Sequence, residues 1–404
     1  MNDNIFAAIP EITQLTRAGR LQEATAAIQR SLGGYAAASN TTGPAERPEK
    51  APFEGVFHVI DSCAIPSSRA RHATPTSPGP QPEPVRAPRE APLGQFITGS
   101  YTNHAGTRAY KLYVPGGYRE QPLPLVVMLH GCTQSPDDFA AGTRMNQLAE
   151  EERCLVLYPA QGQDANVSKC WNWFNACDQQ REQGEPSIIA GITRQIMKSH
   201  RVDPRRVYVA GLSAGGAMAV TMGVTYPELY AATGVHSGLP YAAAHDMPSA
   251  FAALRQGKRT GTGSGNTTGV RAENVGGRGP DVSQPLAPTI VFHGDRDTTV
   301  NPCNGEQVIA QSQAQPANGS ANSQSQTNAR VTVQRGKVAN GHAYTRTVYR
   351  DSSGDASAEH WLVHGAGHAW SGGSPTGSFT DPKGPDAAKE MIRFFLEHPR
   401  LARH

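Results

Sequence analysis

A serine lies in the stretch of the sequence whose residue types best fit a catalytic role. The apolar run 207–210 is followed by Gly211-Leu-Ser213-Ala-Gly215 and then by further small residues. A strand, a tight turn and a helix in this order are typical of a nucleophile elbow, which exposes a serine hydroxyl. The glycines two positions before and after Ser213 let the strand and the helix pass close together. The pattern predicts Ser213 as a nucleophile; the alternative is an ordinary strand–turn–helix connection.

Two later loops hold the acid and the base that a serine nucleophile needs. A serine hydroxyl is a poor nucleophile until a base removes its proton, and a carboxylate orients that base. With this kind of elbow the order along the chain is serine, acid, histidine. We expect Asp297 to be the acid and Asp295, which is closer to the preceding strand, to shape the turn. We expect His368, in a glycine-rich loop, to be the base rather than His364; a solvated loop histidine is the alternative for either.

An earlier loop, residues 130–133, follows the apolar run 123–130. Its glycine lets the backbone turn so that an N–H group points at a developing oxyanion. We expect the N–H groups of Cys132 and Ala214 to form a two-donor oxyanion hole. Loss of one such donor costs about 3 kcal/mol of transition-state stabilisation. Cys132 is therefore assigned a backbone role, and its thiol is not expected to be the nucleophile.

The segment from Cys170 to Cys177 holds three aromatic residues within four positions. Exposed there, Trp171 and Trp173 would line an apolar cleft for the substrate; the alternative is that they pack over the rim of the sheet. Cys170 and Cys177 bracket the loop and would pair in an oxidising compartment, whereas a chain without an export signal favours reduced thiols. The sequence leaves both states open. The histidines lack the spacing of metal ligands with cysteine or carboxylate partners, so no metal site is expected. A serine, a histidine and an aspartate acting in this way require no cofactor.

The elements that position these loops follow from the alternation of apolar runs and helical patterns. Such alternation predicts an α/β fold with a mainly parallel sheet covered by helices on both faces. Strands are expected at 94–101, 108–114, 123–130, 153–158, 206–210, 231–236, 286–293 and 359–363, and helices at 137–151, 188–199, 214–226, 306–313 and 385–397.

Composition divides the chain into three parts. Residues 1–34 show an amphipathic helical pattern, which fits a small helical hairpin or, alternatively, an element that adheres to an apolar surface. Residues 35–93 are rich in proline and predict a disordered linker. Residues 94–404 are expected to form the catalytic domain. Within it, 260–279 and 314–327 have the composition of mobile surface insertions.

Charge and hydropathy exclude several classes of protein. The 404 residues carry 37 lysines and arginines against 34 aspartates and glutamates, a net charge of +3 without a long basic run. A nucleic-acid partner is therefore not indicated. The chain has no run of about 18 apolar residues, so no transmembrane segment is expected. It also lacks a basic N-terminal region followed by an apolar core, so a Sec signal peptide is not expected.

Five segments together resemble the polyhydroxybutyrate depolymerase-like esterase family, a branch of the α/β-hydrolases. The resemblance covers roughly residues 94–398. It implies a serine carboxylesterase with Ser213 as nucleophile, Asp297 as acid and His368 as base, with Cys132 at the oxyanion hole. Trp370 is a further candidate for substrate binding. The segments are 130–134, 170–173, 211–215, 293–300 and 365–373.

The resemblance also sets expectations for the substrate and the location. Family members cleave poly(3-hydroxybutyrate) and short hydroxyacid oligomers, and close relatives cleave feruloyl or acetyl groups from plant polysaccharide. The chain shows no export signal and no separate polymer-binding domain, so it looks more like the intracellular members that act on storage granules. We expect a cytoplasmic, granule-associated polyester hydrolase. The alternatives are a feruloyl or acetylxylan esterase, a catalytically weak granule-binding protein, and secretion without a Sec signal.

Overall fold

The computed structural model describes residues 94–256, 287–313 and 330–400. The predictions for 1–34, for 35–93 and for the insertions at 260–279 and 314–327 lie outside these residues.

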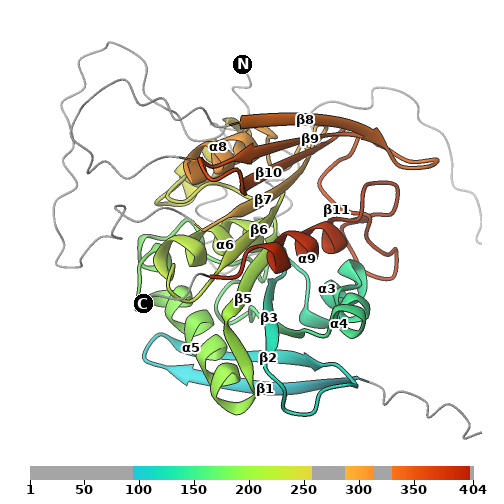
Figure 1. The fold of residues 1–404 in the computed structure, drawn as a ribbon. Helices are drawn as coiled ribbons and strands as arrows, with labels where there is room; N and C mark the ends of the chain where they lie inside the picture. Colours follow the sequence, from blue (N-terminus) through green and yellow to red (C-terminus); the bar gives the residue numbers. More distant parts are fainter. Residues whose placement is uncertain (1–93, 257–286, 314–329, 401–404) are drawn as a thin grey trace, which may run out of the picture. The chain divides into compact units, whose positions relative to one another are not determined.

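A ten-stranded sheet forms the centre of the described chain (Figure 1). The strand order is β1-β2-β4-β3-β5-β6-β7-β10-β9-β8. The strands from β4 to β10 in this order run parallel, and the two outer strands on each side are antiparallel. The strands are β1 (Gln95–Asn103), β2 (Gly106–Val114), β3 (Leu123–Leu129), β4 (Leu155–Pro159), β5 (Val202–Leu212), β6 (Ala232–His236), β7 (Thr289–Gly294), β8 (Arg330–Lys337), β9 (Ala343–Arg350) and β10 (Ala356–Val363).

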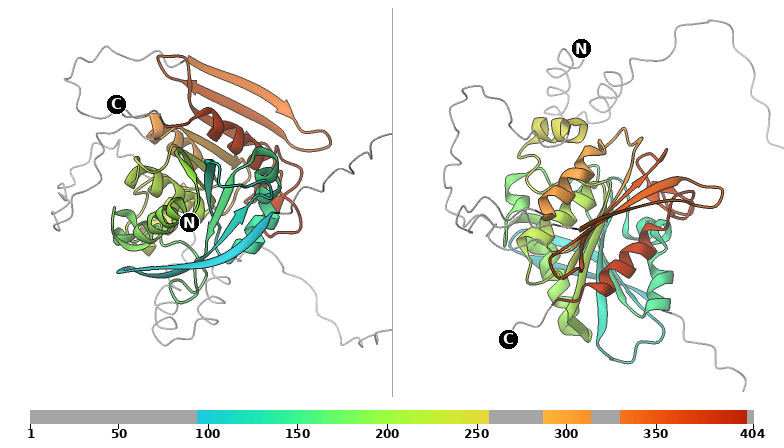
Figure 2. Two further views of the ribbon diagram at one scale, coloured as in Figure 1. Left: turned by 60° about the horizontal axis from the view of Figure 1, so that its bottom comes forward. Right: turned by 45° about the horizontal axis from the view of Figure 1, so that its top comes forward.

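Helices cover both faces of this sheet, as the views of Figures 1 and 2 agree. The strand order and the two helical layers confirm the predicted α/β-hydrolase fold. A short second sheet pairs β11 (Trp370–Ser371) with β12 (Thr380–Asp381). The helices are α3 (Pro136–Thr143), α4 (Met145–Glu152), α5 (Gly184–Ser199), α6 (Ala214–Thr225), α7 (Met247–Gln256), α8 (Cys303–Gln313) and α9 (Ala387–Glu397), with a 3₁₀ turn at Ala176–Gln179.

The central strands are apolar at every position because both of their faces are covered. Strand β3 is buried throughout its length. Its Leu125 and Val127 join the core beneath α5 and α6, whereas Val126 and Met128 join the core beneath α3, α4 and α9. The period-2 geometry of a strand thus sends alternate side chains into two separate cores.

The helix expected over 137–151 is in fact two helices, α3 and α4. Arg144 separates them in the left-handed region, with a φ of 56°, and its N–H donates to Ala140 O. The Arg144 guanidinium donates to Gly372 O at 2.8 Å and to the Asp386 carboxylate at 2.9 Å. Tertiary hydrogen bonds therefore hold a turn that helical periodicity alone does not reveal.

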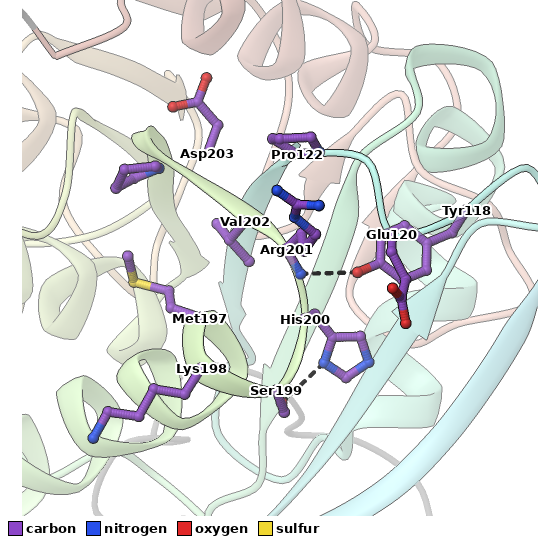
Figure 3. A pocket seen from close by; sticks show the side chains of 11 residues that line it. Tyr118, Glu120, Pro122, Met197, Lys198, Ser199, His200, Arg201, Val202 and Asp203 are labelled. Atoms are coloured by element: carbon purple, nitrogen blue, oxygen red, sulfur yellow. Dashed lines mark hydrogen bonds between the residues drawn. The ribbon is translucent and has the colours of Figure 1, made fainter.

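A pocket lies at the amino ends of the parallel strands, whereas the loops with the predicted site residues follow the carboxyl ends. A pocket of about 580 Å³ opens where β3 and β5 begin and is lined by Tyr118, Glu120, His200 and Arg201, among others (Figure 3). None of the predicted site residues lines it. In open α/β sheets the ligand site lies beyond the carboxyl ends of the strands, and the loops of interest here follow those opposite ends.

Candidate active site

Ser213 sits on the sharp turn between β5 and α6 that the sequence predicts. Its φ of 58° and ψ of −119° lie in a region that side chains other than glycine rarely occupy. A Cβ at Gly211 would lie 2.3 Å from the backbone of Gly215, and one at Gly215 would lie 2.0 Å from Leu129 O. No other residue fits at either position, so the two glycines are what lets the elbow pass beside β3.

Asp297 and His368 meet at the end of β7. His368 Nδ1 lies 2.7 Å from Asp297 Oδ2, and the N–H groups of Thr299 and Val300 donate to Oδ1 at 2.9 and 2.8 Å. Burial alone would raise the pKa of Asp297, but hydrogen bonds from His293 and His368 hold it well below its ordinary range. The carboxylate is therefore ionised, and it fixes the His368 proton on Nδ1 and leaves the Nε2 lone pair as a base.

Asp295 and His364 form a second pair in the same two loops. His364 Nδ1 lies 2.9 Å from Asp295 Oδ2, and His364 Nε2 lies 2.8 Å from Thr345 Oγ1. The N–H of Gly365 donates to Asp295 Oδ1 at 2.7 Å. Both ring nitrogens of His364 are thus engaged, and Asp295 ties the turn together as the sequence led us to expect.

The elbow is joined to the His368 loop through His236. The N–H of Ser213 donates to His236 O at 2.9 Å, and His236 Nε2 accepts the Ser371 N–H at 2.9 Å. Burial, and after it the nearby charge of His293 and His368, lowers the pKa of His236 to about 3, so its ring stays a neutral acceptor. Within the described residues the Ser213 hydroxyl has no hydrogen bond to His368. In serine hydrolases the hydrogen bond between the nucleophile and its base often becomes short only when substrate is bound.

One N–H group of the 131–133 loop is left open, as an oxyanion donor must be. Gly131 N donates to Gln134 Oε1 at 2.9 Å, and Thr133 N donates to Ser168 O at 2.7 Å. In the part of the chain that the structure describes, the N–H groups of Cys132 and Ala214 have no partner. Ala214 is the first residue of α6, where the helix dipole adds to the attraction for an anion.

His130 stabilises the conformation of this loop, a role that the sequence analysis did not assign to it. Its Nδ1 donates to Gly131 O at 2.8 Å, and its Nε2 accepts the Gln161 N–H at 3.1 Å. Burial lowers the pKa of His130 to about 4, which keeps the ring neutral with one donor and one acceptor. The sequence signal was available, because His130 directly precedes the loop that was assigned to the oxyanion hole.

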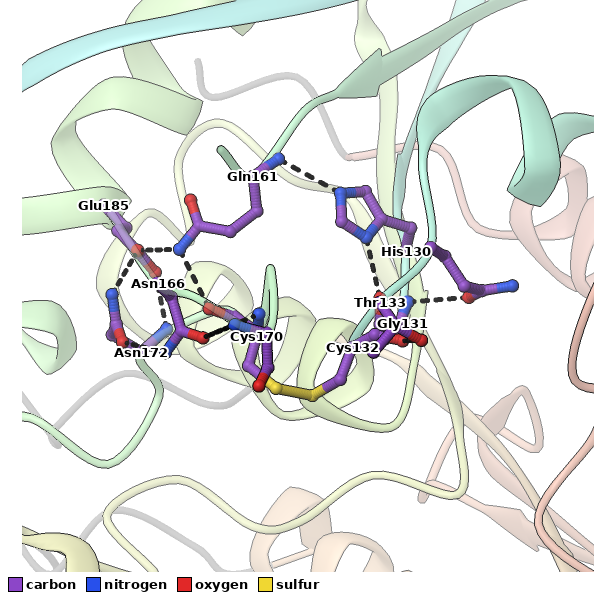
Figure 4. Close-up of a disulfide and its surroundings, with 11 residues drawn as sticks. His130, Gly131, Cys132, Thr133, Gln161, Asn166, Cys170, Asn172 and Glu185 are labelled. Atoms are coloured by element: carbon purple, nitrogen blue, oxygen red, sulfur yellow. Dashed lines mark hydrogen bonds between the residues drawn. A yellow bond between two sulfur atoms is a disulfide. The ribbon is translucent and has the colours of Figure 1, made fainter. Parts of the chain in front are cut away.

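The predicted pairing of Cys170 with Cys177 is wrong, and so is the alternative of reduced thiols for Cys170. Cys170 forms a disulfide with Cys132 (Figure 4). The hydrogen bond from Thr133 N to Ser168 O lays the two loops side by side, which brings these cysteines together. Cys177 is exposed and free, with its sulfur 3.6 Å from the Asp178 carboxylate. Closeness in sequence misled the prediction, because the contact is between loops of two different strands.

The expected exposure of the tryptophans is also wrong. Trp171 and Trp370 are 0% and 1% exposed, and Trp173 is 7% exposed. Trp370 packs edge-to-face on Phe139, with ring centroids 5.4 Å apart, and stacks on His236. Trp171 and Trp173 are thus packed, as in the alternative interpretation, and Trp370, predicted to bind substrate, is packed in the same way.

Exposed apolar side chains lie instead on other segments that follow the carboxyl ends of the strands. Val167 directly precedes Ser168, which accepts the Thr133 N–H, and Phe379 accepts the N–H of Trp370. Phe251 lies on α7, the helix that follows β6. No group of three or more metal-binding side chains occurs among the described residues. No described helix has the length and apolar character to cross a bilayer.

Comparison with known proteins assigns the family. Residues 108–335 match the family model described as Esterase PHB depolymerase. The chain belongs to this family. The chain is 32% identical over 269 residues to poly(3-hydroxyalkanoate) depolymerase C of Paucimonas lemoignei, and the match covers 66% of this chain and 59% of the relative. The resemblance drawn from the sequence motifs is confirmed.

Other similar proteins carry two kinds of name. A poly(3-hydroxybutyrate) depolymerase of Ralstonia pickettii is 26% identical over 77% of this chain and 59% of its own. A probable acetylxylan esterase A of Aspergillus fumigatus is 29% identical over 52% of this chain and 55% of its own. The chain thus spans less than two thirds of the length of each of these three relatives. Among solved structures, an acetyl xylan esterase from Aspergillus awamori gives a TM-score of 0.49 at 18% identity, over 74% of this chain and 99% of its own.

Proposed function

We propose that this protein is a serine carboxylesterase that hydrolyses poly(3-hydroxybutyrate) or its oligomers through Ser213, His368 and Asp297. The observation that carries the proposal is the 2.7 Å contact of a buried, ionised Asp297 with His368, in loops beside a nucleophile elbow. The N–H groups of Cys132 and Ala214, which have no partner among the described residues, complete the set of groups that acyl transfer needs.

The reaction proceeds in two halves. His368 Nε2 takes the proton of the Ser213 hydroxyl as its oxygen attacks the ester carbonyl. The N–H groups of Cys132 and Ala214 donate hydrogen bonds to the carbonyl oxygen and stabilise the negative charge that forms on it. His368 then protonates the leaving alcohol, and an acyl-enzyme remains. Water, activated by the same histidine, attacks the acyl-enzyme and releases the acid.

Two lines of support favour a polyester over other esters. Relatives of this chain are named poly(3-hydroxyalkanoate) and poly(3-hydroxybutyrate) depolymerases. Val167, Phe251 and Phe379 are exposed on segments that follow the carboxyl ends of the strands, and apolar side chains of this kind suit an apolar polymer surface. We also propose an oxidising location outside the cytoplasm rather than the expected cytoplasmic location at storage granules, because the Cys132–Cys170 disulfide persists only where thiols are not kept reduced. Fractionation of cells and medium with an antibody to the chain tests this location.

The decisive test is hydrolysis of amorphous polyhydroxybutyrate granules by the full chain, with chromatography of the released 3-hydroxybutyrate. Ser213→Ala is expected to lower kcat by about 10⁴-fold or more, because removal of the nucleophile disables the whole triad. A p-nitrophenyl ester assay run in parallel separates the chemistry from adsorption to granules. Hydrolysis by Ser213→Ala at the wild-type rate contradicts the proposed mechanism.

A second candidate function is removal of acetyl groups from xylan, which the acetylxylan esterase relatives favour. The same three residues would act, so only the substrate distinguishes the two functions. Release of acetate from acetylated xylan at a higher kcat/KM than release of 3-hydroxybutyrate from its oligomers would select this candidate.

A further inference from the structure

The oxyanion loop is covalently tied to a second loop. Cys132 and Cys170, which are 38 positions apart in sequence, form a disulfide between the loop after β3 and the loop after β4. Next to it, Thr133 N donates to Ser168 O at 2.7 Å. Figure 4 shows the disulfide that joins the Cys132 side chain to this second loop. The adjacent residue Thr133 is bonded to the same loop through its backbone N–H.

The buried carboxylate of Glu185 fixes the loop that contains Cys170. Glu185 is 3% exposed and accepts the Asn172 N–H at 2.7 Å and Asn172 Nδ2 at 2.8 Å. Gln161 Nε2 also donates to Glu185 and reaches Cys170 O at 2.9 Å. Arg108 Nη2 adds an ion pair with Glu185 at 3.4 Å. Because the cluster is buried and hydrogen-bonded, Cys170 is a fixed anchor rather than part of a freely moving loop.

The orientation of the Cys132 N–H group depends on the disulfide to Cys170 more than the orientation of the Gly131 and Thr133 N–H groups does. Gly131 and Thr133 direct their N–H groups to Gln134 and Ser168, so the Cys132 N–H is the donor that this loop offers to an oxyanion. Stabilisation by such a donor requires that it be aimed in advance, because any reorganisation during the reaction costs free energy. The crosslink on its own side chain restricts that peptide group directly.

We propose that the Cys132–Cys170 disulfide is a positioning element of the oxyanion hole, and that its reduction lowers turnover by releasing the Cys132 N–H. The inference rests on the proposed esterase function. Reduction by a dithiol proceeds in two exchanges. One thiolate attacks a protein sulfur, forms a mixed disulfide and releases the other cysteine as a thiolate; the second thiolate of the dithiol then attacks the reductant's own sulfur and releases the remaining protein thiolate. The protein gains two thiols and the dithiol becomes a cyclic disulfide. Both cysteines are partly exposed, so a small reductant can reach them.

The test compares kcat and KM for p-nitrophenyl butyrate among the oxidised full chain, the chain reduced with dithiothreitol, and Cys170→Ala. We expect kcat to fall by about 10- to 100-fold in the last two, below the roughly 10²- to 10³-fold effect of losing a donor outright, with KM within about twofold. Affinity for a boronic acid, which mimics the tetrahedral intermediate, should fall in parallel with kcat. Reoxidation should restore both. Cys177→Ser, a free cysteine close to the same loop, is the matched control and should match the wild type.

The results that would contradict the role of the disulfide differ from those that would contradict the esterase function. A folded Cys170→Ala enzyme, or a reduced enzyme with an intact thermal transition, whose kcat stays within twofold of the oxidised chain overturns the proposal. An equal loss of affinity for substrate and boronic acid also overturns it, because that indicates a general loss of structure. If Cys170→Ala does not fold, reduction of the folded wild type decides. Absence of Ser213-dependent activity in the oxidised wild type instead defeats the proposed function.

Discussion

At the scale of single residues, two histidine–aspartate pairs in the same loops differ in environment rather than in type. The Asp297 side chain is fully buried, whereas that of Asp295 is 34% exposed. His368 has one ring nitrogen bound to Asp297, and His364 has both nitrogens engaged. The sequence ranks these pairs by their distance from the strand ends, and the difference in burial supports the same ranking, which remains a prediction.

Asp297→Asn should therefore lower kcat by about 10³- to 10⁴-fold with little change in KM. An amide offers an N–H where the carboxylate accepts the His368 proton, which favours the wrong tautomer of the base. Steady-state kinetics with p-nitrophenyl butyrate measure the effect. Asp295→Asn is the matched control, and its kcat should remain within about threefold of the wild type. Equal losses in the two variants would contradict the assignment of Asp297.

At the scale of elements, the sequence predicts features that depend on a single helix, strand or turn. It does not predict features that depend on contacts between segments far apart in the chain. The elbow, the central strands and most helices follow from local patterns. The break at Arg144 and the Cys132–Cys170 bond do not, because each depends on a partner from a distant loop. Strand β8 was missed because it is exposed at nearly every position, so no buried apolar run marks it. Burial of the tryptophans also depends on packing between loops.

Gly215 lies where α6 passes closest to the backbone that ends β3, so a side chain at this position should be destabilising. A Cβ at Gly215 would lie 2.0 Å from Leu129 O and 2.6 Å from His130 O, both backbone atoms that cannot rotate away. Gly215→Ala should therefore force β3 and α6 apart, at a cost of about 1–3 kcal/mol or more in stability, and displace the oxyanion loop. Its thermal midpoint and its kcat should both fall.

Gly117→Ala is the matched control for Gly215→Ala. A Cβ at Gly117 meets nothing within 4 Å, and its φ does not lie in the left-handed region. Its thermal midpoint and kcat should equal those of the wild type. A Gly215→Ala enzyme as stable and active as this control would show that the elbow tolerates a side chain, contrary to the close passage of strand and helix.

At the scale of the whole molecule, the sheet gathers buried histidines that make folding sensitive to acid. Burial lowers the pKa of His130 to about 4, of His236 to about 3 and of His360 to about 4. In the unfolded chain these side chains titrate near about 6.5. As pH falls below about 6.5 the unfolded chain binds protons that the folded chain does not, so the free energy of unfolding decreases.

One carboxyl group acts in the opposite sense. Burial, with Asp178 nearby, raises the pKa of Glu185 to about 7, so between about 7 and its ordinary 4.5 the folded chain holds the extra proton and acid stabilises it. Each group shifts stability by about 1.4 kcal/mol per pH unit, and three histidines outweigh one glutamate. Denaturant unfolding followed by tryptophan fluorescence should therefore give a lower free energy of unfolding at pH 5 than at pH 7.

His360→Leu isolates one of these contributions. His360 Nε2 is buried without a hydrogen-bond partner in the described structure, so leucine removes no bond of that atom. The variant should lose about 1.4 kcal/mol less per pH unit between pH 6 and pH 5 than the wild type, because one proton-binding group of the unfolded chain is gone. Its stability at pH 7.5, where the histidine is neutral in both states, provides the baseline. An unchanged pH slope would mean that His360 is not kept neutral by folding, and that the acid sensitivity arises elsewhere in the chain.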